Sequence, residues 1–196
     1  RPSLRQHRSS TSRRDGRRET SLRVHHFHDS GYVVAHTRGG DRLTFDVGRH
    51  GFRNAGHAHA DALAITLSLS GTPFLIDSGT ATYTMDPALR NRMRDTAAHN
   101  TLTVDRRPSA IPRGAFQWAT RANASLSSLR RNPQFVVAEG VHDGFAPAEH
   151  RRTIIHSQHT GWLIVDTVEG VSAPIDGRYG EAMIAAVQST LTRGGD

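Results

Sequence analysis

The chain has 196 residues and a formal net charge of +7, and all 25 of its basic residues are arginine. This length is sufficient for one domain with a hydrophobic core. The absence of cysteine excludes a disulfide framework, thiolate metal ligands and a cysteine nucleophile.

The positive charge is concentrated at the start of the chain. Eight Arg lie within residues 1–23 against two acids, Asp15 and Glu19, so the remainder is nearly neutral. A segment of Arg, Ser, Thr and Gln buries too little apolar surface to fold, and we expect residues 1–23 to be a disordered tail. Such a tail either grips a polyanion or links domains, and we favour the linker. No aromatic residue is interleaved with its arginines, so nucleic acid is not an expected partner.

Neither a membrane partner nor a compartment can be assigned from the sequence. No apolar run approaches the roughly 18 residues that a membrane-spanning helix needs. The charged start of the chain lacks the apolar segment of a signal peptide, so no intact signal peptide is expected. We therefore expect no membrane association and leave the compartment open.

The first predicted elements form a hairpin. Residues 31–37 and 43–47 are rich in apolar and β-branched side chains, and Gly39-Gly40 lies in the turn between them. Residues 48–56 contain three glycines and read as a loop. Residues 61–70 place Leu63, Ile65, Leu67 and Leu69 at every second position, which predicts a half-buried strand.

Short strands dominate the rest of the chain. After a turn at 71–73 we expect strands at 74–77 and 101–104, a helical turn at 87–93, and a turn-rich connection at 105–114. Further strands are expected at 116–121, 124–129, 135–142, 151–156 and 162–166, and a helical turn at 181–187. This pattern predicts an all-β fold, an antiparallel β-sandwich over residues 24–196. Because the strand series stops at 166, we expect the sandwich to be incomplete, truncated at its C-terminal end, with uncovered sheet edges.

Three short segments carry the candidate chemistry. His57, His59 and Asp61 alternate along the chain, so on an extended segment they share one face. Asp77 and His99 each lie beside an apolar strand, where sites are commonly built. Imidazole nitrogens and a carboxylate oxygen suit Zn²⁺ or a similar divalent ion. Since the chain has 13 His, a His-x-His pair also arises by chance as ordinary surface or core histidine.

The three segments together resemble one known family, the C-terminal β-domain of heparinase II/III-type polysaccharide lyases. The matching stretches are GHAHAD at 56–61, LIDSGTATY at 75–83 and RDTAAHNT at 94–101. Their order and spacing match over residues 57–104, and more loosely over 31–168. Enzymes of this family pair an N-terminal α/α toroid with an antiparallel β-sandwich.

The resemblance implies roles for individual residues. His57 matches a histidine of the catalytic cleft, whereas His59, Asp77 and His99 match the ligands of a structural zinc-type site. Asp61 is a rival ligand, ranked below Asp77. Tyr83 and Arg94 match frequent family positions, and we assign them no role beyond packing and surface charge.

The resemblance also implies a reaction, β-elimination on a uronic-acid-containing polysaccharide. His57 would neutralise the uronate carboxylate or share in proton transfer. The expected partners are an acidic polysaccharide and the N-terminal toroid, which this sequence lacks. Because the toroid carries the other cleft residues, we expect this chain alone to be inactive.

Other functions compete with this one. The leading alternative is a carbohydrate-binding or structural β-sandwich module without chemistry of its own. A metal-dependent hydrolase of the amidohydrolase type also uses His-x-His, but it needs alternating strands and helices around a barrel, which this pattern lacks. Serine-nucleophile chemistry is disfavoured since no G-x-S-x-G motif is present. The sequence leaves the particular polysaccharide open.

Overall fold

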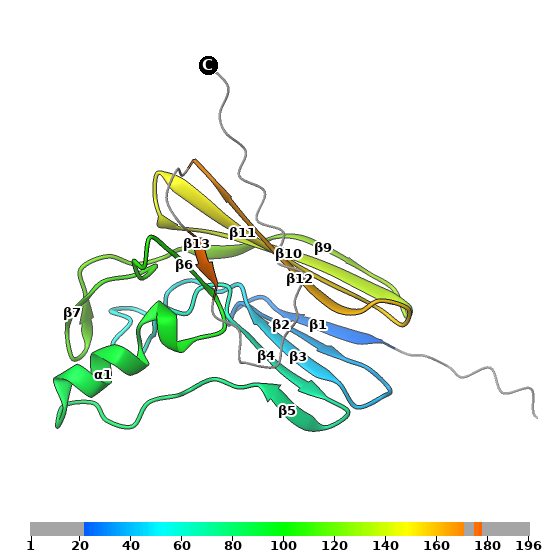
Figure 1. Cartoon of the computed structure of the whole chain (residues 1–196), viewed down its shortest axis with the longest axis horizontal. Helices are drawn as coiled ribbons and strands as arrows, with labels where there is room; N and C mark the ends of the chain where they lie inside the picture. Colours follow the sequence, from blue (N-terminus) through cyan, green and yellow to red (C-terminus); the bar gives the residue numbers. More distant parts are fainter. Residues whose placement is uncertain (1–21, 171–174, 178–196) are drawn as a thin grey trace, which may run out of the picture.

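The computed structural model describes residues 22–170 and 175–177, and two antiparallel sheets stack to form its centre (Figure 1). The first sheet has the strand order β1-β2-β3-β4-β5, with β1 (Arg23–Phe27), β2 (Tyr32–His36), β3 (Arg42–Asp46), β4 (Ile65–Leu69) and β5 (Thr72–Leu75). The second has the order β12-β11-β10-β9, with β9 (Ala124–Arg131), β10 (Phe135–Phe145), β11 (Ala148–Ser157) and β12 (Gly161–Glu169). The predicted antiparallel all-β fold is confirmed.

Smaller elements lie at one end of the two sheets. Helix α1 (Pro87–Met93) and the 3₁₀ helix η1 (Thr96–Ala98) follow β5, then β6 (Leu102–Val104) pairs with β13 (Ile175–Gly177), and β7 (Pro112–Gly114) pairs with β8 (Gln117–Trp118). Asp86 caps α1 because its carboxylate accepts a hydrogen bond from the amide of Leu89 at 2.8 Å. The helical turn expected at 87–93 is therefore confirmed. Within the described residues, no helix is long and apolar enough to cross a membrane.

The predicted hairpin is present, and its register decides what the site contains. Strands β2 and β3 pair antiparallel across the Gly39-Gly40 turn, with Tyr32 opposite Asp46 and His36 opposite Arg42. Alternation along β3 sends Leu43 and Phe45 into the core, so Arg42, Thr44 and Asp46 lie on the other face.

Several predicted boundaries were wrong. The predicted tail includes Arg23, but β1 begins there and pairs with β2. Residues 61–64 are not strand, since Leu63 has a φ of +59° and β4 begins only at Ile65. Strand β5 starts at Thr72 within the predicted turn. Residues 1–21 of the predicted tail and the helical turn at 181–187 lie outside the described residues.

The sequence suggested that the strand series stops at residue 166, but the strands continue beyond it. Strand β12 continues to Glu169, because Glu169 pairs with Glu149 of β11. Strand β13 follows at Ile175–Gly177 and pairs antiparallel with β6. At three residues this last strand is too short to show an alternating pattern in the sequence.

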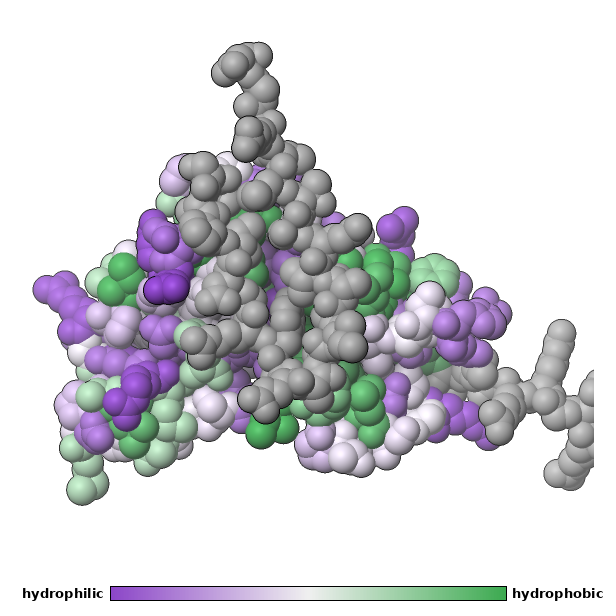
Figure 2. Space-filling model, in the orientation of Figure 1, coloured by the Kyte–Doolittle hydropathy of each residue, from purple (hydrophilic) through white to green (hydrophobic). Residues whose placement is uncertain are grey.

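The main core lies between the two sheets. It joins inward residues of the first sheet, such as Phe45 and Ile65, to those of the second, such as Ile154 and Ile164. Gly140 in β10 permits the closest approach, because a Cβ there would lie 2.6 Å from a methyl carbon of Leu63. Figure 2 shows that hydrophilic residues cover much of the face over α1, with smaller apolar areas between them.

Candidate active site

The motif at residues 56–61 lies in a turn-rich segment immediately before β4, and its alternation is preserved there. Ala60 is fully buried, and its amide donates to the carbonyl of Arg94 at 2.8 Å. The polar residues between the alanines, His57, His59 and Asp61, line one cavity of about 330 Å³. All three side chains therefore border the same cavity, as Ala58 and Ala62 do, although the segment is not the extended strand on which we expected them to share a face.

Two further polar residues line this cavity, Tyr32 and Asp46. Asp46 accepts a hydrogen bond from the amide of Gly48 at 2.8 Å. Burial and then the charge of Asp61 raise the pKa of Asp46 to about 7, and the Asp46 carboxylate raises the pKa of Tyr32 to about 12. We did not predict this pair from the sequence, although the register of the predicted hairpin places both residues opposite each other.

Side chains in and after β8 hold the loop beside the cavity by donating hydrogen bonds to its backbone carbonyls. Trp118 donates its indole N–H to the carbonyl of Ala55 at 2.8 Å. The guanidinium of Arg121 donates to the carbonyls of Arg53 and Asn54. These bonds fix a segment that has no regular secondary structure of its own.

One ligand atom from each of His59, Asp61 and His99 lies within 4.8 Å of the others. His99 is buried, and within the described part of the chain its Nε2 atom has no hydrogen-bond partner. Two imidazoles and a carboxylate are a suitable donor set for Zn²⁺. An orphaned buried nitrogen costs free energy unless something binds it, so these residues fit a metal ion.

Asp77 contacts the same histidine from another side. The Oδ2 atom of Asp77 lies 2.6 Å from Nδ1 of His99. This hydrogen bond lowers the pKa of Asp77. Burial would lower the pKa of His99, but the bond to Asp77 and the charge of Asp61 raise it on balance. Zinc–ligand bonds are roughly 2 Å long. Oδ2 of Asp77 and Nδ1 of His99 would therefore need to move only slightly apart to bind one ion together.

His59 is neutral, and its acceptor nitrogen faces Arg90. Its Nε2 atom lies 3.3 Å from the guanidinium of Arg90, and arginine can only donate, so this nitrogen accepts. Burial, followed by the charges of His99 and Arg90, lowers the pKa of His59 to about 4. The ring is therefore neutral at physiological pH, as a metal ligand must be.

His57 is exposed at the rim of the cavity, beside two aromatic rings. Its ring centroid lies 5.3 Å from that of Tyr83 and 5.7 Å from that of Phe116. The guanidinium of Arg90 lies over the ring of Tyr83, with its central carbon 4.8 Å from the ring centroid. Phe116 was missed because nothing in the sequence around it signals a site.

Arg94 has a structural role. It is buried, and it donates to the carbonyls of Gly114 and Ala115 and to the side chain of Asn91. The surface-charge interpretation of Arg94 was therefore wrong, because the side chain is buried. The packing interpretation is confirmed, since the guanidinium also lies over the ring of Trp118 at 4.9 Å.

Comparison with known proteins shows the family of this chain. The family model for the heparinase II/III-like C-terminal domain matches residues 19–178. No curated protein matches the sequence.

Solved structures share the fold. A heparinase III is 21% identical with a TM-score of 0.59, covering 74% of this chain and 22% of that one. The heparan sulfate lyase HepC from Pedobacter heparinus is 20% identical with a TM-score of 0.57, covering 73% of this chain and 21% of that one. The chain thus spans under a quarter of the length of these two proteins.

The match covers most of the chain, including every described strand. The sequence therefore belongs to the heparinase II/III-like family, as the C-terminal domain of such proteins.

Proposed function

We propose that this chain is the β-domain of a lyase that cleaves a uronic-acid-containing polysaccharide by β-elimination. The observation that carries the proposal is the position of His57, exposed at the rim of a polar cavity, in a chain of the heparinase II/III-like family. The heparinase III and heparan sulfate lyase structures that share its fold are consistent with an acidic glycan as substrate.

In this reaction a base removes the proton α to the uronate carboxylate. The electron pair forms a carbon–carbon double bond, the bond from the β carbon to the leaving oxygen breaks, and an acid protonates that oxygen. His57 is placed to neutralise the uronate carboxylate or to exchange one of these protons, since imidazole can do either near neutral pH. Tyr83 and Phe116 restrict the directions in which its ring can turn.

The metal in this proposal is structural. His59, Asp77 and His99 would hold a zinc-type ion, with Asp61 as the rival carboxylate. The ion would supply a fixed crosslink between the segment before β4, the end of β5 and the segment before β6. Because His57 lies two residues from His59, such a crosslink fixes the backbone that aims the catalytic imidazole.

Several apolar side chains in the segments after β5 and β7 are exposed, two of them beside His57, and we propose that the rest of the enzyme covers them. Met85 is 95% exposed and Ile76 68%, while Tyr83 and Phe116 contact His57. Exposed apolar groups that cluster beside a site commonly mark a surface for another domain. An N-terminal toroid packed here would complete the cleft, and the chain alone would then lack activity.

The test uses a protein in which this chain is joined to a toroid domain of the family. Formation of unsaturated uronate from heparan sulfate and from alginate is followed by ultraviolet absorbance, for wild type, His57→Ala and His159→Ala. His159 is an exposed histidine far along the chain from the site and serves as the matched control. We expect His57→Ala to lose at least about a hundredfold in turnover, the range of a general acid or base, with His159→Ala unchanged.

Three results would contradict parts of this proposal. Equal turnover in the His57→Ala variant and the control would remove the assigned role of His57. Glycan binding without turnover in the joined wild-type protein would favour the non-catalytic carbohydrate-binding module. Rapid turnover by the isolated chain would refute the need for a toroid.

A further inference from the structure

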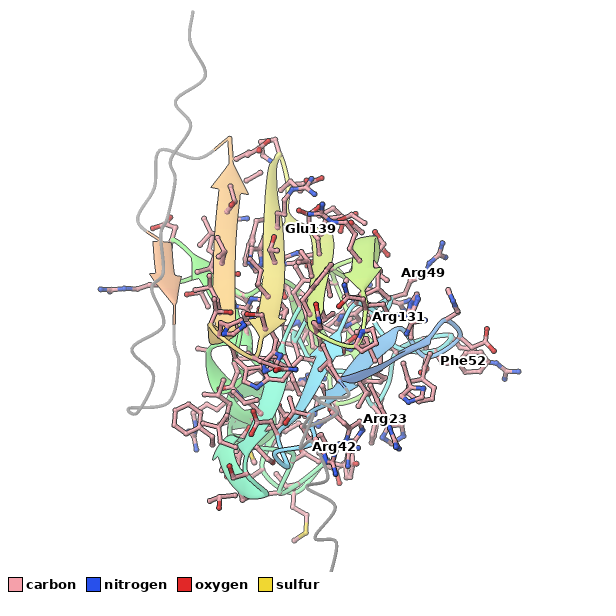
Figure 3. All side chains as sticks on the ribbon, turned by 90° about the vertical axis from the view of Figure 1, so that its right-hand side faces the viewer. Arg23, Arg42, Arg49, Phe52, Arg131 and Glu139 are labelled. Carbon is pink, nitrogen blue, oxygen red and sulfur yellow. The ribbon has the colours of Figure 1, made fainter. Side chains whose placement is uncertain are left out.

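A group of arginines lies along one side of the sandwich, where the edge strand β1 of the first sheet meets β9 of the second. Arg23, Arg42, Arg49 and Arg131 all lie on this side (Figure 3). The two sheets are joined there, because the amide of Leu22 donates to the carbonyl of Pro133 and Arg131 donates to the carbonyl of Val24. We name these four arginines the basic face.

The strand register sets part of the spacing of this face. Arg23 pairs with His36, and His36 pairs with Arg42, so the three side chains form a row across β1, β2 and β3. Adjacent strands are about 4.8 Å apart, which places the two arginine Cα atoms roughly 10 Å from each other. Arg42 lies four residues from Asp46 on the same face of β3, or about 13 Å from the candidate cavity.

These arginines differ from those that stabilise the fold. Arg90, Arg94 and Arg152 are buried and donate to backbone carbonyls. Arg23, Arg42 and Arg49 are exposed, and within residues 22–170 none of them forms an ion pair. Glu139, which Figure 3 labels on the second sheet, is already held by Arg151 and Ser127. Exposed cations without acidic partners are available to an anionic ligand.

A second cavity connects this face to the candidate active site. It has a volume of about 640 Å³ and is lined by Arg49, His26 and His28, among others. It shares Arg49, Ser30 and the glycines 48 and 51 with the cavity that holds His57. Asp29 is its sole carboxylate. A ligand could therefore pass from one cavity to the other along the surface.

The histidines of this region report the local excess of positive charge. Burial and then the charges of Arg42, His25 and Arg23 lower the pKa of His36. Burial followed by the charges of His28 and Arg131 lowers the pKa of His26. Both histidines therefore lie in the positive field of these arginines.

We propose that the basic face binds an acidic polysaccharide beyond the sugar units at His57, as a continuation of the same binding track. This inference rests on the proposed function, because continuity with that site is what favours a glycan over other polyanions. The bound groups would be carboxylates or sulfates spaced along an extended sugar chain, which Arg23, Arg42 and Arg49 would contact in turn.

The experiment compares two triple variants of the whole chain with equal charge. One is Arg23→Gln, Arg42→Gln and Arg49→Gln. The control is Arg92→Gln, Arg106→Gln and Arg107→Gln, which are exposed arginines on α1 and after β6. Residues 1–21 and their seven arginines are the same in both. The probes are fluorescent heparan sulfate oligosaccharide, unsulfated polyuronate oligosaccharide and single-stranded DNA, each titrated at several salt concentrations.

We expect the basic-face variant to weaken heparan sulfate or polyuronate binding by at least about tenfold and to reduce the salt dependence, whereas the control changes it less than about twofold. Equal loss in both variants, or no loss in either, would overturn the proposal. A loss for DNA as large as the loss for both glycans would overturn the glycan assignment. The proposed function is tested separately by the turnover of His57→Ala in the joined protein, so failure of catalysis and failure of this face are distinguished.

Discussion

The guanidinium of Arg152, in β11, donates to the backbone carbonyl of Asn100 at 2.7 Å. It also donates to the carbonyl of Leu63 at 2.8 Å, so one side chain of the second sheet holds two segments that carry the candidate metal ligands. Asp166 in β12 accepts two hydrogen bonds from the same guanidinium and a third from the ring of His150. Since all three side chains are buried, this network links the sandwich interior to the site.

The first prediction concerns Arg152. Replacing it with Met leaves the Asp166 carboxylate buried without its cation, which should cost about 3–5 kcal/mol in the free energy of unfolding. Arg151→Met is the matched control, because Arg151 pairs with acids at the surface and its loss should cost less than about 1 kcal/mol. Denaturant unfolding measures both. Adding Asp166→Leu to Arg152→Met should restore part of the loss, and a further drop would contradict this explanation.

The second prediction concerns the proposed metal. Purified wild-type protein should contain about one zinc-type ion per chain by elemental analysis, and His59→Ala should contain almost none. His57→Ala should retain the ion, because His57 is not among the proposed ligands. Absence of metal from the wild type after growth with added zinc, or equal loss in both variants, would refute the site.

The third prediction separates the two carboxylates. If Asp77 is the ligand, Asp77→Asn should weaken zinc binding in a chelator competition far more than Asp61→Asn does. If Asp61 is the ligand, Asp77 orients His99 from behind, and its loss should cost about 10–100-fold in affinity. We expect the first result. The reverse order would assign the metal to the cluster of His59, Asp61 and His99.

The fourth prediction concerns stability at acidic pH. Burial lowers the pKa of His50 to about 4, below the 6.5 of an unfolded histidine. Between pH 6.5 and 4 the unfolded chain binds a proton at this residue that the folded chain does not, so His50 makes stability fall as pH falls. Asp46 instead makes stability rise as pH falls, because burial raises its pKa to about 7.

Comparing wild type with His50→Gln isolates the contribution of His50 to the pH dependence of stability. Below pH 6, the free energy of unfolding of the wild type should fall more steeply than that of the variant, by roughly 1 kcal/mol per pH unit. Urea unfolding between pH 7 and pH 5 measures the difference, and parallel curves would contradict it.

The fifth prediction concerns the contact between the sheets. Gly140→Ala places a methyl group 2.6 Å from Leu63 and 2.9 Å from Val47, so the sheets must separate, and we expect a loss of about 1–3 kcal/mol. Gly114→Ala is the control, because a Cβ there meets nothing within 4 Å and should change stability by less than about 0.5 kcal/mol. Thermal unfolding distinguishes them, and equal melting temperatures would show that β10 adjusts freely.

Sequence patterns predicted the hairpin of β2 and β3 and the strands β9 to β12, because alternation and turn residues are local properties. The boundaries failed where tertiary contacts decide. Residues 61–64 alternate like a strand, yet the left-handed backbone at Leu63 turns the segment so that its carbonyl reaches Arg152. Strand β1 was missed because its apolar alternation is weak, and it is stabilised by pairing with β2 and by contacts with the second sheet.

For the site, the sequence alone identified His57, His59 and Asp61 as one group of polar candidates, because they stand together in one short motif. Only the tertiary structure decided which distant groups join them. It brought His99 and Asp77 together, added Tyr32 and Asp46 to the cavity, and placed Phe116 beside His57. These residues lie 11 to 59 positions from His57, and their proximity to it depends on how distant segments pack together, which no local pattern encodes.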